Sequence, residues 1–598
     1  MEEKWVVKRK WAPFQKLAEE FGIDPLIVRL MRNRDVFTEE DLKTQMPDGH
    51  SLAEKNIDRF LHATTADLYD PALMKDMKKA GQVIIDAVGE KKKIRVIGDY
   101  DIDGIMSTYI LVNGLKKIGA DVDWQIPDRM KDGYGLNENL IRKADADGVQ
   151  LIVTCDNGIA ARDQIALGND LGMQIVVTDH HQVPFETVKN GDGTEKRKEI
   201  LPPADAVIDP HRADDSYPFK GLCGAGVAWK LITYLYRETG VGDADKEAEK
   251  FLQFAAIATV GDVMDLTDEN RIIVREGLKQ LRRTENPGLR ELIRQNNLDP
   301  EKIDVYHIGF VIGPCLNASG RLDTAARALN MLMTSSVQEA SEAASELMNL
   351  NESRKGMTET GTAEAMRKID TTSLIDDRVL IVYLPDSHPS VVGIIAGRIK
   401  EHYNRPTFVL TDADGMIRGS GRSIDAYNMY DELVKCADLF TAFGGHPKAA
   451  GVTLPKENLQ AFHDRMNEEC SLTEEDMTPV VKVDAVMPQT YVTTSLIREL
   501  DVLRPTGNGN ERPIFGEVRV TARSPRIVGQ KQNCCLLQVV SEDGSSAVKA
   551  IYFGRTPDDA RDFYQRITDG TPFSIIYEPQ IDSWMGRDSV QLHIIHYK

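Results

Sequence analysis

The chain has 598 residues, of which 41% are hydrophobic and 28% are charged, and its formal net charge is −20 at pH 7. A chain of this length exceeds what one hydrophobic core supports and predicts roughly three or four domains. The acidic balance argues against a protein that coats nucleic acid indiscriminately, because such binding depends on Lys and Arg neutralising phosphates. Nucleic acid remains open as a substrate, since an acidic chain can still line one groove with arginine.

No stretch is apolar for long enough to span a bilayer, and the first residues, MEEKWVVKRKWAPF, lack the apolar core of a signal peptide. We therefore expect a cytoplasmic protein with no membrane attachment. The seven cysteines are scattered and form no C-x-x-C pair, which argues against a disulfide framework and against a zinc knuckle.

The first 322 residues divide into a lead-in and an α/β domain. Residues 1–80 carry apolar side chains near helical spacing, which predicts an N-terminal helical lead-in. Apolar runs that alternate with amphipathic segments then follow at 94–97, 122–126, 151–154, 175–178 and 206–208. This alternation predicts an α/β domain over 81–322, with a parallel sheet covered on both faces. The polar segment 189–200 is expected to be a surface loop or insertion.

The remaining chain predicts three further parts. Few helix breakers occur over 323–372, which indicates a long helical connector. Two apolar runs around a helical stretch then predict a second α/β domain over 373–466. Beyond a charged run, six apolar runs predict a small β-domain of barrel type over 467–598.

Three acids at alternate positions follow the first predicted strand, in IRVIGDYDIDG, at Asp99, Asp101 and Asp103. Loop aspartates usually cap helices or make turns, but three carboxylates in five residues repel one another. The pattern D-x-D-x-D-G also begins an EF-hand, yet its twelfth position is Ile110 instead of Glu and the preceding segment is strand-like. A catalytic metal site is the better explanation, with a helix expected from Ile105 onward.

Two further predicted strands end in side chains that bind metals, because Asp156 follows one and Asp179-His180-His181 follows the next. In a doubly wound sheet, ligands bind beyond the carboxyl ends of the strands, so these side chains are expected to share one crevice. Asp262, in ATVGDVMDL, is a fourth candidate. Each residue alone could be a loop acid or a structural histidine, and their joint placement favours a site.

Many carboxylates with few histidines suit Mn²⁺ or Mg²⁺ better than Zn²⁺, and they suggest two ions. Two ions that share a bridging carboxylate can clamp a phosphate, lower the pKa of a water and stabilise a leaving oxygen. The reaction class that this pattern predicts is phosphoester hydrolysis.

Phosphate chemistry also needs cations, and Arg129, Arg321 and Arg422 stand in glycine-rich or turn-like contexts. Each alone could equally be a solvated surface residue. Ser420, between Gly419 and Gly421, could add phosphate donors. The sequence Gly444-Gly445-His446-Pro447 is expected to be another glycine-rich turn, whose histidine could be structural.

Together these motifs resemble the DHH phosphoesterase superfamily and, within it, the RecJ family of bacterial single-strand-specific DNA exonucleases. The resemblance spans nearly the whole chain. DYDIDG, CDNG, DHH and GDVMDL stand at four DHH motifs, and NASGRL is similar to the motif that ends the first core domain. GSGRS and GGHPKAAG look like the DHHA1 domain, and LRPTGNGNERPIF resembles the entry to an oligonucleotide-binding (OB) domain.

The resemblance implies a role for each matched residue. The implied metal ligands are Asp99, Asp101, Asp103, Asp156, His180 and Asp262. Asp156 would bridge two ions, and Asp179 would orient the ligands from behind. Asp156, His181 and Arg321 would be the catalytic residues, with His181 at the scissile phosphate. The implied substrate-binding residues are Arg129, Arg321, Ser420, Arg422, Gly444, Gly445 and His446.

The resemblance also implies an activity and partners. Members of this family use Mn²⁺ or Mg²⁺ to degrade single-stranded DNA from the 5′ end to mononucleotides in recombination and repair. A RecQ-type helicase and a single-stranded-DNA-binding protein are the expected partners. A DHH phosphodiesterase for short oligonucleotides or cyclic dinucleotides is the alternative, but small substrates need no additional strand-binding domain. A replication scaffold without catalysis would have lost ligand positions, and here they are intact.

Overall fold

The computed structural model describes residues 3–129, 135–189, 195–584 and 586–598. The chain forms two compact units. The first contains residues 1–3, 70–262 and 277–479, and the second contains residues 4–69, 263–276 and 480–598. Within the described ranges, no helix is long and apolar enough to cross a membrane.

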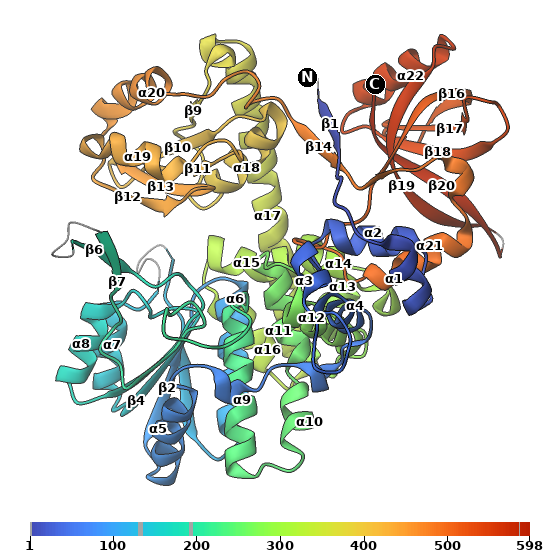
Figure 1. Ribbon diagram of the computed structural model, residues 1–598. Coiled ribbons are helices and arrows are strands. Elements are labelled where there is room, and N and C mark those ends of the chain that lie inside the picture. Colours follow the sequence, from blue (N-terminus) through green and yellow to red (C-terminus); the bar gives the residue numbers. More distant parts are fainter. Residues whose placement is uncertain (1–2, 130–134, 190–194, 585) are drawn as a thin grey trace. The chain divides into compact units, whose positions relative to one another are not determined.

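A five-stranded parallel sheet organises the first part of the first unit (Figure 1). Its strands, in spatial order, are β3 (Asp121–Gln125), β2 (Lys93–Ile97), β4 (Leu151–Cys155), β5 (Gln174–Thr178) and β8 (Ala206–Ile208). All neighbouring pairs are parallel, which confirms the predicted sheet. This is the doubly wound order 2-1-3-4-5, whose ligand site lies at the switch point between the first and third strands, here β2 and β4.

Helices cover both faces of this sheet. α7 (Glu138–Ala146) and α8 (Arg162–Asp170) share a hydrophobic core with one face, and α6 (Ile102–Lys117) and α9 (Gly224–Thr239) lie on the other (Figure 1). Strands that are buried on both faces need apolar side chains at successive positions, and this requirement explains their continuous apolar runs. The helices thereby fix the carboxyl ends of the strands in place.

Two parts of the first unit differ from expectation. The segment expected to be a loop at 189–200 contributes to a hairpin, in which β6 (Phe185–Lys189) pairs antiparallel with β7 (Glu195–Glu199). Residues 190–194 lie outside the described residues. The turn expected at Gly444 to Pro447 is instead the end of a strand, β12 (Ala442–His446), which pairs with β13 (Ala449–Leu454).

A long helix precedes the second sheet of this unit, as predicted. α16 (Ala326–Met333) is followed by α17 (Val337–Asp370), a helix of 34 residues. The sheet has the order β12-β13-β11-β10-β9, and only β9 and β10 are parallel. Its remaining elements are β9 (Leu380–Tyr383), α18 (Val392–Tyr403), β10 (Thr407–Ala413) and β11 (Met416–Arg422). A second α/β domain is therefore confirmed.

A closed barrel forms the core of the second unit. Its strands are β16 (Phe515–Val528), β17 (Cys534–Val540), β18 (Ala547–Phe553), β19 (Phe573–Trp584) and β20 (Arg587–Tyr597). They follow the order β16-β17-β18-β20-β19, and a further pairing of β16 with β19 closes the ring. α22 (Pro557–Thr568) stands between the third and fourth strands in sequence. A small five-stranded barrel of this kind is the OB type, as predicted.

The N-terminal segment is more than a helical lead-in. Its helices are α1 (Phe14–Phe21), α2 (Pro25–Asn33), α3 (Glu39–Lys43) and α4 (Leu52–His62). Before them, β1 (Lys4–Val7) is a strand and pairs in parallel with β14 (Val480–Val483), which a helical prediction missed. Side chains of α1 and α2, such as Leu17 and Leu30, belong to the same buried cluster as the barrel residue Phe515.

Candidate metal centre

The three predicted motifs meet at one edge of the parallel sheet. Asp99 and Asp101 follow β2, Asp156 follows β4, and Asp179-His180-His181 follows β5. Asp156 adopts a left-handed backbone conformation with φ of 59°, which Asp tolerates better than most residues. The fourth candidate, Asp262, caps the C-terminus of a helix, α11 (Leu252–Gly261), and does not follow a strand. The structure thus brings residues from four separate segments together.

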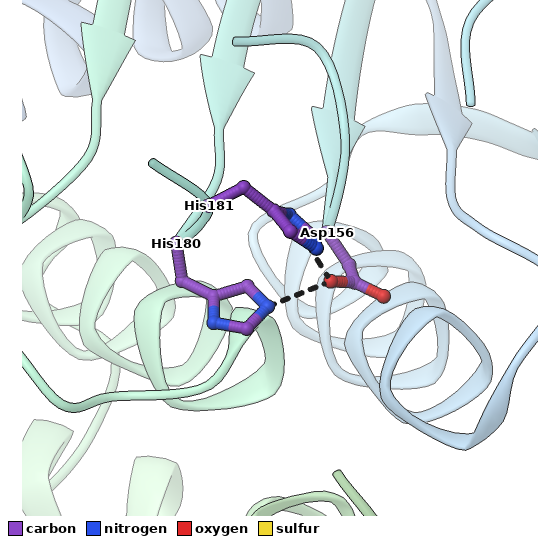
Figure 2. Close-up of side chains that lie close together, drawn as sticks. All are labelled: Asp156, His180 and His181. Carbon is purple, nitrogen blue, oxygen red and sulfur yellow. Dashed lines mark hydrogen bonds and ion pairs between the residues drawn. The ribbon is translucent and has the colours of Figure 1, made fainter. Parts of the chain in front are cut away.

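His180 stands at the centre of the acidic groups. Its Nε2 lies 3.0 Å from Asp156, 3.5 Å from Asp103 and 3.8 Å from Asp262. Figure 2 shows the rings of His180 and His181 turned toward the carboxylate of Asp156, which comes from the neighbouring strand end. The Nδ1 of His181 is 4.0 Å from the same carboxylate. Asp156 is therefore within reach of both imidazoles.

Asp103 is held by the start of a helix. Its two carboxylate oxygens accept hydrogen bonds from the amides of Gly224 at 2.6 Å and Ala225 at 2.7 Å, which are the first residues of α9. A helix N-terminus favours a negative charge in this position. The sequence alone predicted no role for these two residues. The small residues in LCGAGVA are the available signal, because a Cβ at Gly224 would lie 2.7 Å from the Cβ of Asp156.

Gly224→Ala should therefore damage the centre without removing any charged group. The new methyl would overlap Asp156, and overpacking of this kind costs about 1–3 kcal/mol. We expect a lower unfolding free energy in denaturant titrations, together with weaker Mn²⁺ binding by calorimetry. Gly356→Ala is the matched control, since a Cβ there meets nothing within 4 Å, and it should stabilise helix α17 by about 0.5–1 kcal/mol. Equal behaviour of the two variants would contradict the proposed contact.

Asp179 orients the histidines from behind. Its carboxylate accepts from the amide of Ile159 at 2.9 Å, from the amide of His180 at 2.8 Å and from Nδ1 of His181 at 2.8 Å. Burial opposes the ionised form of Asp179, but the bond and charge of His181 hold its pKa below the usual value. Burial likewise opposes the charge on His181, and its bond to Asp179 outweighs this and raises its pKa to about 9. The bond to the buried carboxylate of Asp179 thus favours the protonated form of His181.

The other acids crowd each other. Burial, followed by the charges of neighbouring carboxylates, raises the pKa of Asp99 and of Asp262 to about 8. The same two causes raise the pKa of Asp156 well above its usual value. Carboxylates that are buried and repel each other are costly without a compensating cation.

The donor atoms fit divalent cations. Three sets of ligand atoms each lie within 4.8 Å of one another, and the sets are Asp99-Asp101-Asp156, Asp156-His180-His181 and Asp103-His180-Asp262. Asp156 and His180 each belong to two sets, so the sets adjoin. Carboxylate oxygens with one or two imidazoles are the donors that Mn²⁺ and Mg²⁺ accept. The three adjoining sets offer ligands for more than one ion.

The arginine candidates gather beside this centre. The guanidinium of Arg129 lies 5.1 Å from the ring of Tyr100, within the first motif, and residues 130–134 lie outside the described residues. Arg321 belongs to a helix, α15 (Gly313–Leu322), and not to a turn. Burial, then the charges of Arg129 and other arginines including Arg422, lowers the pKa of Arg321 to about 10. Arginines that repel each other in a buried place favour an anion between them.

The remaining candidates lie on the second sheet of the first unit. Ser420 and Arg422 are two residues apart on β11 and both face the start of α18, where a Cβ at Gly393 would lie within 3.3 Å of each. Gly444, Gly445 and His446 lie exposed on the edge strand β12. In the part of the chain that the structure describes, no hydrogen bond or ion pair joins His446 to the acidic groups.

The NASGRL motif, which contains the candidate Arg321, also contains a residue that supports the acidic loop. In NASGRL, Asn317 accepts a hydrogen bond from the amide of Ile102 at 2.9 Å and so ties α15 to the first turn of α6. That turn begins at Ile102, earlier than the expected Ile105, because Asp101 caps it through the amides of residues 103 and 104. Arg321 therefore sits on a helix that is fastened to the acidic loop.

Three protein-family models match the sequence. The DHH family N-terminal domain matches residues 93–259, the DHHA1 domain matches residues 376–472, and the RecJ OB domain matches residues 483–596. Two similar proteins are named single-stranded-DNA-specific exonuclease RecJ. The one from Bacillus subtilis is 35% identical over 97% of this chain and 69% of its own length, and the one from Haemophilus influenzae is 30% identical over 98% of both.

Solved structures agree with the fold. A RecJ crystal structure with Mn²⁺ from Thermus thermophilus superposes with a TM-score of 0.78 at 24% identity, covering 100% of this chain and 79% of that chain. A second structure, of an exonuclease RecJ bound to manganese, has a TM-score of 0.56 at 30% identity, covering 66% of this chain and 94% of that one.

Proposed function

The chain belongs to the RecJ family of single-stranded-DNA-specific exonucleases, and we propose that it removes mononucleotides from the 5′ end of single-stranded DNA. It is a divalent-metal-dependent exonuclease whose substrate is single-stranded DNA. The observation that carries the proposal is the meeting of Asp103, Asp156, His180 and Asp262 at the switch point of the sheet. The barrel of OB type supports a strand as substrate, since this fold binds single strands along a groove.

Two ions, Mn²⁺ or Mg²⁺, would occupy the centre. Their proposed ligands are Asp99, Asp101, Asp103, Asp156, His180 and Asp262, with Asp156 shared. When bound, such ions supply positive charge to a phosphoryl oxygen and lower the pKa of a water. The amides of Gly224 and Ala225 hold the carboxylate of Asp103 in place, so that its orientation does not depend on the substrate.

His181 would act on the scissile phosphate. Asp179 accepts a hydrogen bond from its Nδ1 and fixes the ring, on a side chain that is 40% exposed. A protonated imidazole can donate a hydrogen bond to a phosphate oxygen and balance its charge. Arg321 would add a second donor. Its positive charge, together with the charges of Arg129 and Arg422, favours an anion at this place.

The 5′ polarity rests on a phosphate site at the end of the strand. Ser420 and Arg422 are its proposed donors, with Arg129 and the exposed run Gly444, Gly445 and His446 along the strand. Burial, then the charge of Arg129, lowers the pKa of Arg422, and among the described residues no ion pair joins this guanidinium to a carboxylate. A terminal phosphate would supply an anionic partner.

Digestion of end-labelled strands with Mn²⁺ tests the proposal. A 5′ label should appear at once as a labelled mononucleotide, whereas a 3′ label should stay on shortening strands, and EDTA should stop both. Blunt duplex should resist digestion until a RecQ-type helicase and ATP are added. We place the enzyme in the cytoplasm, where a helicase opens its substrate strands and a single-stranded-DNA-binding protein coats them. Early release of the 3′ label would reverse the polarity. Hydrolysis of dinucleotides alone would favour a phosphodiesterase for short oligonucleotides.

A further inference from the structure

The hairpin of β6 and β7 has no place in the sheet that carries the metal centre. It begins four residues after His181 and ends before β8, and Figure 1 shows it standing apart from the parallel strands. Its base is fastened twice. The amide of Ile200 donates to the carbonyl of Pro184 at 2.7 Å, and the carboxylate of Glu199 accepts from the amide of Ala213 at 3.0 Å. These two bonds fix the base of the hairpin to the rest of the domain.

Both faces of the hairpin carry exposed apolar and basic groups. Phe185 is 48% exposed and Val188 is 40% exposed, although a two-stranded hairpin gains its stability from covered apolar side chains. β7 contains Lys196, Arg197 and Lys198 in succession, in a chain whose net charge is −20. An apolar and cationic surface on such a chain indicates an anionic ligand with flat apolar parts.

One face of the hairpin has side chains better arranged to bind such a ligand than the other. The pairing of Thr187 with Arg197 and of Phe185 with Glu199 puts these side chains on the same side of the ladder. There the guanidinium of Arg197 lies over the ring of Phe185, 4.4 Å from its centroid. On the opposite face, Lys198 is already paired with Glu186 at 3.0 Å. Arg197 has no such ion pair among the described residues, and the carboxylate of Glu199 is engaged by an amide.

We propose that the Phe185–Arg197 face of this hairpin binds one nucleotide of the DNA strand outside the metal centre. The inference rests on the proposed function, since it takes the substrate to be a single strand. A stacked aromatic ring and guanidinium offer a flat surface to a base, and the guanidinium also reaches a phosphate. Because the hairpin begins four residues after His181 in the chain, we assign the nucleotide to the same strand as the cleaved phosphate. Thr187, opposite Arg197 on the same face, can donate a hydrogen bond.

The test measures binding without hydrolysis. In EDTA, Phe185→Ala and Arg197→Ala should each raise the Kd of a fluorescent single strand about fivefold or more. Arg197→Ala should also flatten the salt dependence of log Kd by about 0.7, the value for one phosphate contact on a single strand. Arg197→Lys should restore the salt dependence but not the full affinity. Arg142→Ala is the matched control, because Arg142 is an exposed arginine on α7, paired with Glu138.

A base analogue then locates the nucleotide. With 2-aminopurine placed at successive positions, wild-type protein should quench one position, and Phe185→Ala should restore its fluorescence. Hydrolysis of a dinucleotide with Mn²⁺ should stay unchanged in both variants, because this substrate does not extend beyond the centre. Unchanged Kd and unchanged quenching in both variants would overturn the inference. Intact strands after incubation of wild-type protein with Mn²⁺ would instead overturn the proposed function and leave the binding result standing.

Discussion

Asp156→Asn should lower the rate of mononucleotide release by about a thousandfold, which corresponds to about 4 kcal/mol of lost transition-state stabilisation. Asp156 belongs to two of the three ligand sets and lies 3.0 Å from His180. Asparagine keeps the shape of the side chain and tolerates the left-handed backbone, so the fold should persist. The measurement is release of label from a 5′-labelled single strand at saturating Mn²⁺.

The melting temperature separates this loss from misfolding. Burial and neighbouring charges raise the pKa of Asp156, so its ionised form is unfavourable in the metal-free protein. Asp156→Asn removes that charge and should leave the melting temperature in EDTA unchanged or higher. The rise that Mn²⁺ produces in the wild type should shrink, because a bound ligand stabilises by an amount that depends on its affinity. Asp163→Asn, at an exposed position on α8, should change neither quantity. Retained activity in Asp156→Asn would remove this residue from the centre.

Asp103→Asn should cost about a thousandfold in rate, whereas Asp99→Asn should cost about tenfold. Asp103 is fully buried and accepts from two amides at 2.6 and 2.7 Å. An asparagine there would turn its own NH₂ group toward one of those amides and leave a buried donor unpaired, at about 1–3 kcal/mol. Asp99 accepts a long hydrogen bond of 3.4 Å from the amide of Gly135, which an asparagine oxygen can also accept.

The rate and the denaturant midpoint should therefore both fall further in Asp103→Asn than in Asp99→Asn. Asp103→Asn should lower the denaturant midpoint as well as the rate, and Asp99→Asn should lower mainly the rate. Equal losses of activity in the two variants would refute the ranking. A large fall in the midpoint for Asp99→Asn alone would show that Asp99 is the structural residue of the two.

The strand ends could be predicted because they depend on local sequence. An apolar run that stops at an acid places the acid at the carboxyl end of a strand, and parallel strands share that edge. The DYDIDG acids, Asp156 and Asp179-His180-His181 were found in this way. The role of the amides of Gly224 and Ala225 could not be predicted, since it depends on where α9 begins relative to the first turn of α6, 121 residues earlier. The helical setting of Arg321 was missed because glycine and serine in NASGRL are typical of turns.

The hairpin shows a different limit. Its sequence is polar and contains glycines, which favours a loop over a strand, and only the pairing of β6 with β7 makes strands of it. The strand β1 was missed for a similar reason, because its partner β14 lies more than 470 residues away. Pairing over such separations leaves no local signal. The sequence predicted a domain of barrel type, but it did not predict that the pairing of β16 with β19 closes the barrel.

The pairing of β1 with β14 has a consequence for synthesis of the chain. The barrel unit draws on residues 4–69, 263–276 and 480–598, and nearly all of the first unit lies in the chain between the first and the last of these segments. A ribosome adds roughly 5–20 residues per second, so the N-terminal helices wait on the order of 20–80 s for their partners. During that time the apolar side chains Leu17, Ile27 and Leu30 lack the barrel that buries them. Nascent-chain chaperones should contact this segment first, and a fragment that starts at the barrel would lack part of its own core.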